Sequence, residues 1–180
     1  HDLPSSPATL DELLREDVIP YTALMPELDA IMLAHVEFPA IDAERPASLS
    51  PRIIRRFLRD QLGFDRHVIL TDDLDMGAIA SRYGRGEDAR LAIEAGNDLA
   101  LICHQAASAP EAAAAIATLP LMMRDEAMER VERLRLKKLQ GPLVWSEPQW
   151  AKTCAALADL AAMAPEMQAP PPANSPVEDY

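Results

Sequence analysis

Cysteine is scarce in this sequence. Only Cys103 and Cys154 stand among 180 residues, and neither has a second cysteine in a Cys-x-x-Cys spacing. A scaffold held together by disulfides is therefore not expected, and we predict two buried, reduced thiols, as in a reducing compartment. Glycine is scarce too, with six residues, and the sequence contains no glycine-rich phosphate loop or dinucleotide fingerprint.

Basic residues and long apolar runs are also few. The 17 lysines and arginines are outnumbered by 29 acidic residues, so the formal net charge is −12 and a nucleic-acid partner is not expected. No stretch approaches the roughly 18 to 20 apolar residues of a membrane span. The opening residues lack the basic start and apolar core of a signal peptide. Because the chain starts at His1 rather than methionine, we expect it to be a piece of a longer protein.

Apolar segments alternate along the chain with amphipathic ones. The length and the apolar content of the chain are sufficient for one α/β domain with a hydrophobic core. Buried strands are predicted at 28–36, 67–73 and 98–104, and helices at 9–20, 50–63, 86–98, 108–120 and 124–141. Successive strand–helix units predict parallel strands joined by right-handed crossovers. Such a series belongs to a doubly wound sheet or a (β/α)8 barrel.

The ends of several predicted helices carry recognisable signals. Thr9 and Glu12 have the spacing of a capping box, and Pro20 is expected to end or kink the helix that follows them. Gly63 and Gly96 follow the last apolar positions of two further helices, where glycine commonly ends a helix.

Acidic residues gather where the second predicted strand ends. Asp72, Asp73 and Asp75 lie within four residues, while His35 and His104 end the other two strands. In parallel α/β folds the chemistry gathers at these carboxyl ends. Neighbouring strand residues point to opposite sides, and no second acidic cluster or His-x-His completes a ligand set, so no metal is expected. A catalytic carboxylate is favoured over a solvated loop with a helix cap.

Residues 34–80, AHVEFPAIDAERPASLSPRIIRRFLRDQLGFDRHVILTDDLDMGAIA, resemble the family 3 glycoside hydrolases, specifically their β-N-acetylglucosaminidase branch. The likeness joins Ala-His-Val, Pro-Ala-Ile-Asp, Pro-Ala-Ser-Leu-Ser-Pro, Leu-Arg-x-x-Leu-Gly-Phe-Asp and Thr-Asp-Asp-Leu-x-Met in that order. Residues 92–103 are similar to the family's next passage. The opening His-Asp-Leu-Pro resembles the end of the family's Asp-Ser-His-x-x-Leu-Pro loop.

This resemblance implies a fold and a reaction. Residues 1–141 would be the C-terminal portion of a (β/α)8 TIM barrel, about strands six to eight, with the N-terminal half of the barrel missing. Asp72 would be the nucleophile of a retaining hydrolase and His1 its general acid/base. A histidine near its ordinary pKa of about 6.5 can give and recover a proton near neutrality. The Asp and Ser of the loop and the Lys-His-Phe-Pro-Gly-His-Gly segment are absent from this sequence.

The resemblance also implies a substrate and a location. The substrate would be a muropeptide or disaccharide with a terminal β-linked N-acetylglucosamine, hydrolysed in the cytoplasm during peptidoglycan recycling, without a cofactor. Two alternatives stay open. One is a family 3 glycosidase that prefers glucose or xylose, and the other is a non-catalytic or metal-binding α/β module.

Other residues have two interpretations each. His35 lines the sugar subsite or is a hydrogen-bonded core histidine. Asp73 belongs to the substrate site and orients the neighbours of Asp72, or it caps the next helix. Met76 borders the pocket or packs. The basic face formed by Arg52, Arg55, Arg56 and Arg59 is expected to be solvated. Residues 142–164 are expected to form a terminal helix packed on the barrel, and the proline-rich tail 165–180 to be disordered and without function.

Overall fold

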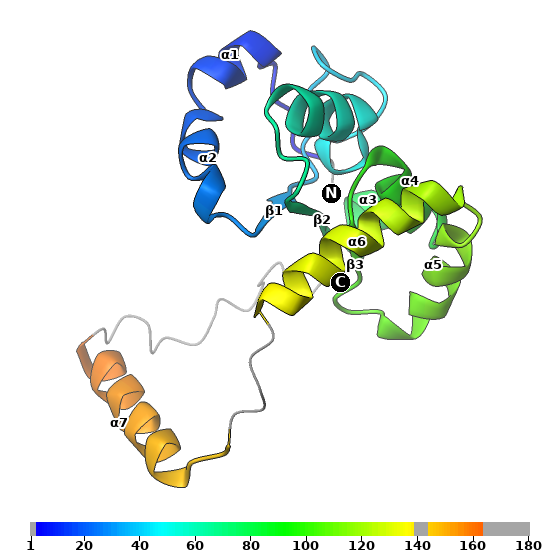
Figure 1. The fold of residues 1–180 in the computed structure, drawn as a ribbon. Coiled ribbons are helices and arrows are strands. Elements are labelled where there is room, and N and C mark those ends of the chain that lie inside the picture. Colours follow the sequence, from blue (N-terminus) through cyan, green and yellow to red (C-terminus); the bar gives the residue numbers. More distant parts are fainter. Residues whose placement is uncertain (1–2, 139–143, 164–180) are drawn as a thin grey trace. The chain divides into compact units, whose positions relative to one another are not determined.

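The computed structural model describes residues 3–138 and 144–163 (Figure 1). The chain divides into two units, the second of which begins at Leu139 and contains helix α7 (Glu147–Met163). The first contains α1 (Leu10–Arg15), α2 (Ile19–Ala23), η1 (Met25–Glu27), β1 (Ala30–Leu33), η2 (Ala47–Leu49), η3 (Arg52–Gln61), β2 (Val68–Asp73), α3 (Gly77–Ala80), α4 (Glu87–Ala95), β3 (Leu99–Leu101), η4 (Ala106–Ser108), α5 (Ala109–Ile116) and α6 (Leu121–Lys138).

The three strands form one parallel sheet in the order β1-β2-β3, which confirms an α/β fold. Each strand lies within a predicted segment but is shorter than predicted. Residues 142–146 before α7 are not helical where the structure describes them, and the packing of α7 stays a prediction. His1 and the tail 165–180 lie outside the described residues.

One face of the sheet is covered by helices. Ile31 pairs with Ile69 along β1 and β2, and Ile69 packs with Ile54 and Phe57 of η3 and Ala95 of α4. Full burial of a side chain such as Phe or Ile contributes about 1.5–3 kcal/mol. This hydrophobic cluster therefore holds η3 and α4 against one face of the sheet.

The other face of the sheet is largely bare in the described part of the chain. Met32 pairs with Leu70, which pairs with Leu99, so the three side chains lie on the same face. Met32 is 55% and Leu99 38% exposed. Several apolar side chains side by side on one face of a sheet are normally covered, so this face has the character of a surface that packs against more protein.

Helix α4 lies close to η3 because glycine follows it. Gly96 has φ +112°, the left-handed region, and its N–H donates to Ile93 O at 3.0 Å. A Cβ on this residue would lie 2.9 Å from Arg55 Cγ and 3.1 Å from Ile54 Cγ2. Glycine here both ends the helix, as predicted, and leaves room for the neighbouring helix.

Helix α6 lies along the amino ends of the strands. Arg130 Nε donates to Asp98, just before β3, at 2.8 Å, and Lys137 Nζ donates to Asp29, just before β1, also at 2.8 Å. Seven helical residues advance about 10 Å. Two strand spacings also amount to about 10 Å. The spacing of these cations thus matches the spacing of the acids, and α6 closes the end of the sheet opposite Asp72.

Three expectations were wrong. The capping box of Thr9 and Glu12 forms, but α1 ends at Arg15, and Pro20 lies in the first turn of a second helix, where a missing N–H costs nothing. Both cysteines are exposed rather than buried. Arg59 is buried, not solvated, because its guanidinium reaches under β2 to the Asp98 carboxylate at 2.9 Å.

No helix among the described residues is long and apolar enough to cross a membrane.

Candidate active site at the carboxyl ends of the strands

Asp72 lies near the carboxyl end of β2, on the bare face of the sheet. Its side chain is half-buried, and its Oδ1 accepts the N–H of Asp73 at 2.8 Å. Because Leu70 and Asp72 are two residues apart in one strand, they share a face. One carboxylate oxygen is therefore held by the backbone while the group as a whole remains accessible.

Asp73 points to the opposite side of β2, as the alternation of the strand predicts. It is buried, and its Oδ1 accepts the N–H groups of Asp75 and Cys103, each at 3.0 Å. Its Oδ2 lies 3.3 Å from His104 Nε2. These bonds tie the end of β2 to the segment that follows β3. The structure thus places the Asp73 side chain among protein groups, on the opposite side of β2 from the Asp72 side chain, while the Asp73 backbone N–H contacts Asp72.

Asp75 anchors the loops that follow β2 and β3. Its Oδ2 accepts the N–H groups of His104 and Gln105, both at 2.8 Å, and its Oδ1 pairs with Arg85, which also pairs with Asp88 at 2.9 Å. Burial would raise the pKa of Asp75, but the two backbone N–H groups and the Arg85 charge lower it overall. Asp88 differs, because its burial outweighs its hydrogen bonds and raises its pKa.

His35 connects the end of β1 to the end of β2. The ring is 3% exposed, with Nε2 2.9 Å from Asp73 O and Nδ1 2.6 Å from Ser48 Oγ. A carbonyl oxygen only accepts, so Nε2 carries a proton and donates. Burial lowers the pKa of His35, which favours the neutral ring, whose Nδ1 then accepts a hydrogen bond from the Ser48 hydroxyl. Both ring nitrogens are therefore engaged within the protein, as in the core histidine that the sequence left open.

Met76 and the segment after His1 complete the carboxyl end of the sheet. Met76 is half-buried and precedes α3, and its N–H donates to Asp73 O at 3.2 Å. Near the chain start, Glu37 N–H donates to Pro4 O at 2.8 Å and Ser6 N–H donates to Glu37 O at 2.9 Å. Glu37 follows β1, so residues 4–6 lie beside the loop at the same end of the sheet as Asp72.

The packing of Leu3 extends this placement toward Asp72. Leu3 contacts the hydrophobic cluster that contains Leu74 and Ile79, which follow Asp72 in the chain. His1 itself lies outside the described residues.

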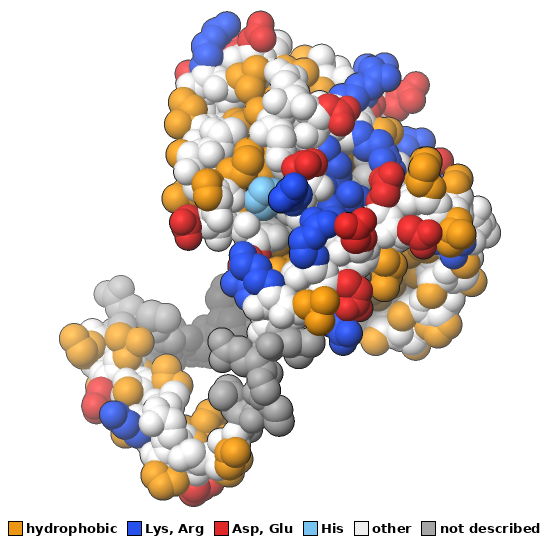
Figure 2. Space-filling view, in the orientation of Figure 1, with side chains coloured by type: hydrophobic (Ala, Val, Ile, Leu, Met, Phe, Trp, Pro, Cys, Tyr) orange, Lys and Arg blue, Asp and Glu red, His pale blue; other side chains and the backbone are white. Residues whose placement is uncertain are grey.

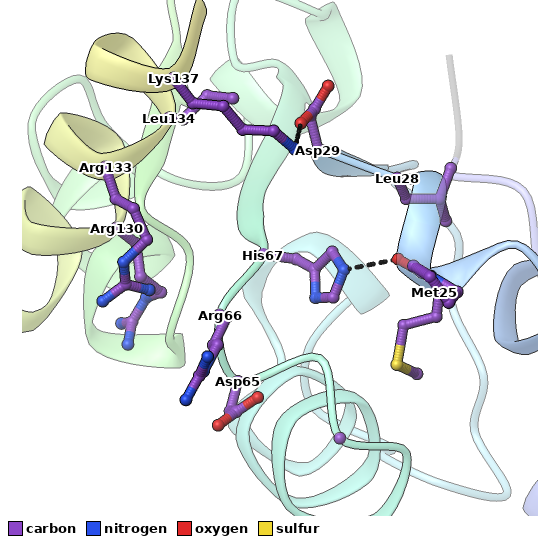
Figure 3. A pocket seen from close by; sticks show the side chains of 12 residues that line it. Met25, Leu28, Asp29, Asp65, Arg66, His67, Arg130, Arg133, Leu134 and Lys137 are labelled. Atoms are coloured by element: carbon purple, nitrogen blue, oxygen red, sulfur yellow. Dashed lines mark hydrogen bonds and ion pairs between the residues drawn. The ribbon is translucent and has the colours of Figure 1, made fainter.

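A cavity of about 530 Å³ lies at the opposite end of the sheet, between η1 and α6 (Figure 3). His67 Nε2 donates to Met25 O at 2.9 Å in its wall, and Lys137 points to Asp29 (Figure 3). Figure 2 shows basic side chains gathered on the face in view with acidic side chains among them. The cavity lies below the amino ends of β1 and β2 and does not include Asp72.

Sequence reasoning missed Ser48 and Arg85, although both hold the site together. Neither residue has a spacing from its partner that a helix or strand pattern would predict. His35 lies 13 residues from Ser48, and Asp75 lies 10 residues from Arg85. Within residues 3–138 and 144–163, no group of three or more histidine, cysteine, aspartate or glutamate side chains is arranged so that it could hold a metal ion.

Comparison with known proteins identifies a consistent group of relatives. The model of the glycosyl hydrolase family 3 N-terminal domain matches residues 1–135. A β-hexosaminidase of Pseudomonas aeruginosa is 34% identical over 155 residues, covering 86% of this chain and 45% of that protein. A β-hexosaminidase of Stenotrophomonas maltophilia is 41% identical over 104 residues, covering 57% of this chain and 30% of that protein.

A solved structure extends the likeness to three dimensions. A family 3 β-N-acetylglucosaminidase from Paenibacillus superimposes with a TM-score of 0.73 at 34% identity, covering 82% of this chain and 30% of that one. The chain therefore spans less than half the length of these relatives.

Proposed function

Because the chain belongs to glycosyl hydrolase family 3, we propose that it is the nucleophile-bearing part of a retaining β-N-acetylglucosaminidase. The observation that carries the proposal is the position of Asp72. Its half-buried carboxylate stands at the carboxyl end of a parallel strand, with one oxygen held by a backbone N–H at 2.8 Å. In a retaining hydrolysis, a carboxylate at the site of reaction is the group that attacks the sugar.

In the proposed reaction, an oxygen of Asp72 attacks the anomeric carbon while the bond to the leaving oxygen breaks. The general acid, His1, gives its proton to that oxygen. Water then attacks the glycosyl-aspartate, loses a proton to His1 and releases the sugar with retained configuration. The assignment of His1 is supported by the family resemblance and by residues 3–6, which lie at the same end of the sheet as Asp72.

We propose that β1, β2 and β3 are strands six to eight of a (β/α)8 barrel. The bare face with Met32 and Leu99 would then be the barrel interior, which layers of side chains from all strands fill. The missing N-terminal half would supply those layers and the residues that grip the sugar. Helix α7 would pack on the outside of this barrel.

For the substrate, we propose a muropeptide or disaccharide fragment of peptidoglycan with a terminal β-linked N-acetylglucosamine. The names of the relatives support the sugar, since they are β-hexosaminidases and a β-N-acetylglucosaminidase. The cytoplasm is the proposed location, where such fragments are recycled. His35 and Asp73 are engaged with protein groups and are better suited to support the site than to contact the sugar. Met76 stays a candidate for the pocket border.

The test uses the full-length protein that contains these residues, with aryl β-N-acetylglucosaminide as substrate. Asp72→Ala should lower kcat/KM by about a thousandfold or more. Asp60→Ala, at an exposed carboxylate of η3, is the matched control and should stay within about twofold. A fluorinated N-acetylglucosamine analogue should label Asp72, as identified by peptide mass spectrometry.

Several outcomes would contradict the proposal. Label on a residue other than Asp72, or undiminished turnover by Asp72→Ala, would remove the nucleophile. Faster hydrolysis of aryl glucosides or xylosides would favour another specificity within the family. A melting temperature raised by divalent cations, with no hydrolysis of any of these substrates, would favour a metal-binding module.

A further inference from the structure

The direction of the Asp72 carboxylate depends on the backbone of Asp73. The Asp73 N–H is the donor to Asp72 Oδ1 at 2.8 Å, so a rotation of the Asp73 backbone would turn the carboxylate with it. Reacting atoms must lie about 3–3.5 Å apart with aligned orbitals, and a misplacement of about 1 Å can cost a hundredfold in rate. Whatever holds Asp73 still therefore holds the nucleophile.

The side chain of Asp73 is held by the segment that follows β3. Oδ1 accepts the N–H of Cys103 at 3.0 Å, and Oδ2 lies 3.3 Å from His104 Nε2. The same Oδ1 accepts the N–H of Asp75 at 3.0 Å, which closes the turn after β2. These contacts fix the carboxylate of Asp73, whereas its carbonyl oxygen accepts the N–H of Met76 within the turn at 3.2 Å and a second, shorter hydrogen bond from outside the turn.

The donor of this second bond is His35, on the β1 side. His35 Nε2 donates to Asp73 O at 2.9 Å, and Nδ1 is oriented by Ser48 Oγ at 2.6 Å. The ring is 3% exposed, so water cannot readily replace it as a donor. The imidazole thus bridges the loop after β1 to the last residue of β2, next to the proposed nucleophile.

We propose that His35 is a positioning residue for the hydrolysis, which restrains the backbone of Asp73 through its carbonyl group and so aims the carboxylate of Asp72, without contacting the sugar. This inference rests on the proposed function. It assigns Ser48 the part of orienting the imidazole. Removal of the His35 donor should slow attack on the anomeric carbon while leaving the binding of the sugar nearly unchanged.

The test compares three variants of the full-length enzyme with the aryl substrate. His35→Leu removes the donor and should lower kcat by about 10- to 100-fold with KM changed by less than about threefold. His35→Gln places an amide N–H near the position of Nε2 and should restore most of kcat. Labelling of Asp72 by the fluorinated analogue should slow in the same proportion as kcat.

His67→Leu is the matched control. His67 also donates from Nε2 to a backbone carbonyl, Met25 O, at 2.9 Å, but just before β2 begins, at the other end of the strand. This variant should lose melting temperature yet keep kcat within about twofold. A loss of kcat equal to that of His35→Leu would show a general effect of stability and overturn the inference.

Ser48→Ala decides the matter if His35→Leu does not fold. It leaves the imidazole in place and removes only the group that orients it, so kcat should fall several-fold with KM nearly constant. Unchanged kcat in folded His35→Leu, or in Ser48→Ala, overturns the inference while the parent enzyme remains active. A parent enzyme with no hydrolysis at all overturns the proposed function, and the inference with it.

Discussion

Replacement of Asp98 by asparagine should be among the most destabilising single changes in this chain. The carboxylate is buried and serves two cations, because Oδ2 accepts from Arg59 Nη2 at 2.9 Å and Oδ1 accepts from Arg130 Nε at 2.8 Å. Oδ2 also accepts the N–H of Ile69 at 2.9 Å, within β2. Burial lowers the pKa of Arg59, and the Asp98 charge opposes this effect.

The magnitude follows from what asparagine leaves behind. Arg59 is 8% exposed, so without Asp98 its charge is buried and uncompensated, and breaking such a pair costs about 3–5 kcal/mol. The amide NH₂ would also face a donor, either Arg130 Nε or the Arg59 guanidinium. The free energy of unfolding should therefore fall by about 3–5 kcal/mol in Asp98→Asn.

Urea unfolding of the full-length protein, followed by circular dichroism, measures this loss. With a slope of about 2 kcal/mol/M, the midpoint should fall by about 1.5–2.5 M at unchanged slope. Asp60→Asn is the same substitution at an exposed site and should change the free energy by less than about 0.5 kcal/mol. A loss below about 1 kcal/mol in Asp98→Asn would refute the reasoning, since it would mean that water reaches Arg59.

Two further predictions concern pH and backbone geometry. Burial lowers the pKa of His35, so the unfolded chain binds this proton at a higher pH than the folded chain. The contribution of the neutral His35 to the free energy of unfolding should be fully present above about pH 6.5 and should be lost as the pH falls below that value. In His35→Gln the melting temperature should therefore depend less on pH between about pH 7 and 5. An unchanged pH dependence of the melting temperature in this variant would contradict the prediction. Gly96→Ala should cost about 1–3 kcal/mol, because φ is +112° and the new Cβ would press on Arg55 and Ile54; a denaturation midpoint equal to that of the parent would show that both helices adjust.

Much of the fold could be predicted because its signals are local. The alternation of apolar and amphipathic segments predicts the three strands and their helices, and Gly63 and Gly96 mark two helix ends where φ is positive. The Thr9–Glu12 capping box forms as the spacing predicts. Each of these signals involves only a few neighbouring residues, so it can be recognised from the sequence alone.

The position of the candidate nucleophile was also readable from local order. An acidic residue at the end of an apolar strand lies at the carboxyl edge of a parallel sheet, and this placement does not depend on contacts with distant segments. Asp72 lies at that edge. Alternation along the strand placed Asp73 on the other side. The roles of both residues stay predictions.

The partners of these residues depended on contacts between distant segments. His35 and Asp73 are 38 residues apart, and Arg59 and Asp98 are 39 apart, so neither pairing leaves a periodic trace. Arg59 stands in a row of arginines that a helix pattern assigns to solvent, yet its place under β2 buries it. Such residues become buried and paired only when the folded strands bring them to within hydrogen-bonding distance. The local sequence pattern was therefore enough to locate the carboxylates at the end of β2. Only the three-dimensional packing determined which groups hold these carboxylates in place.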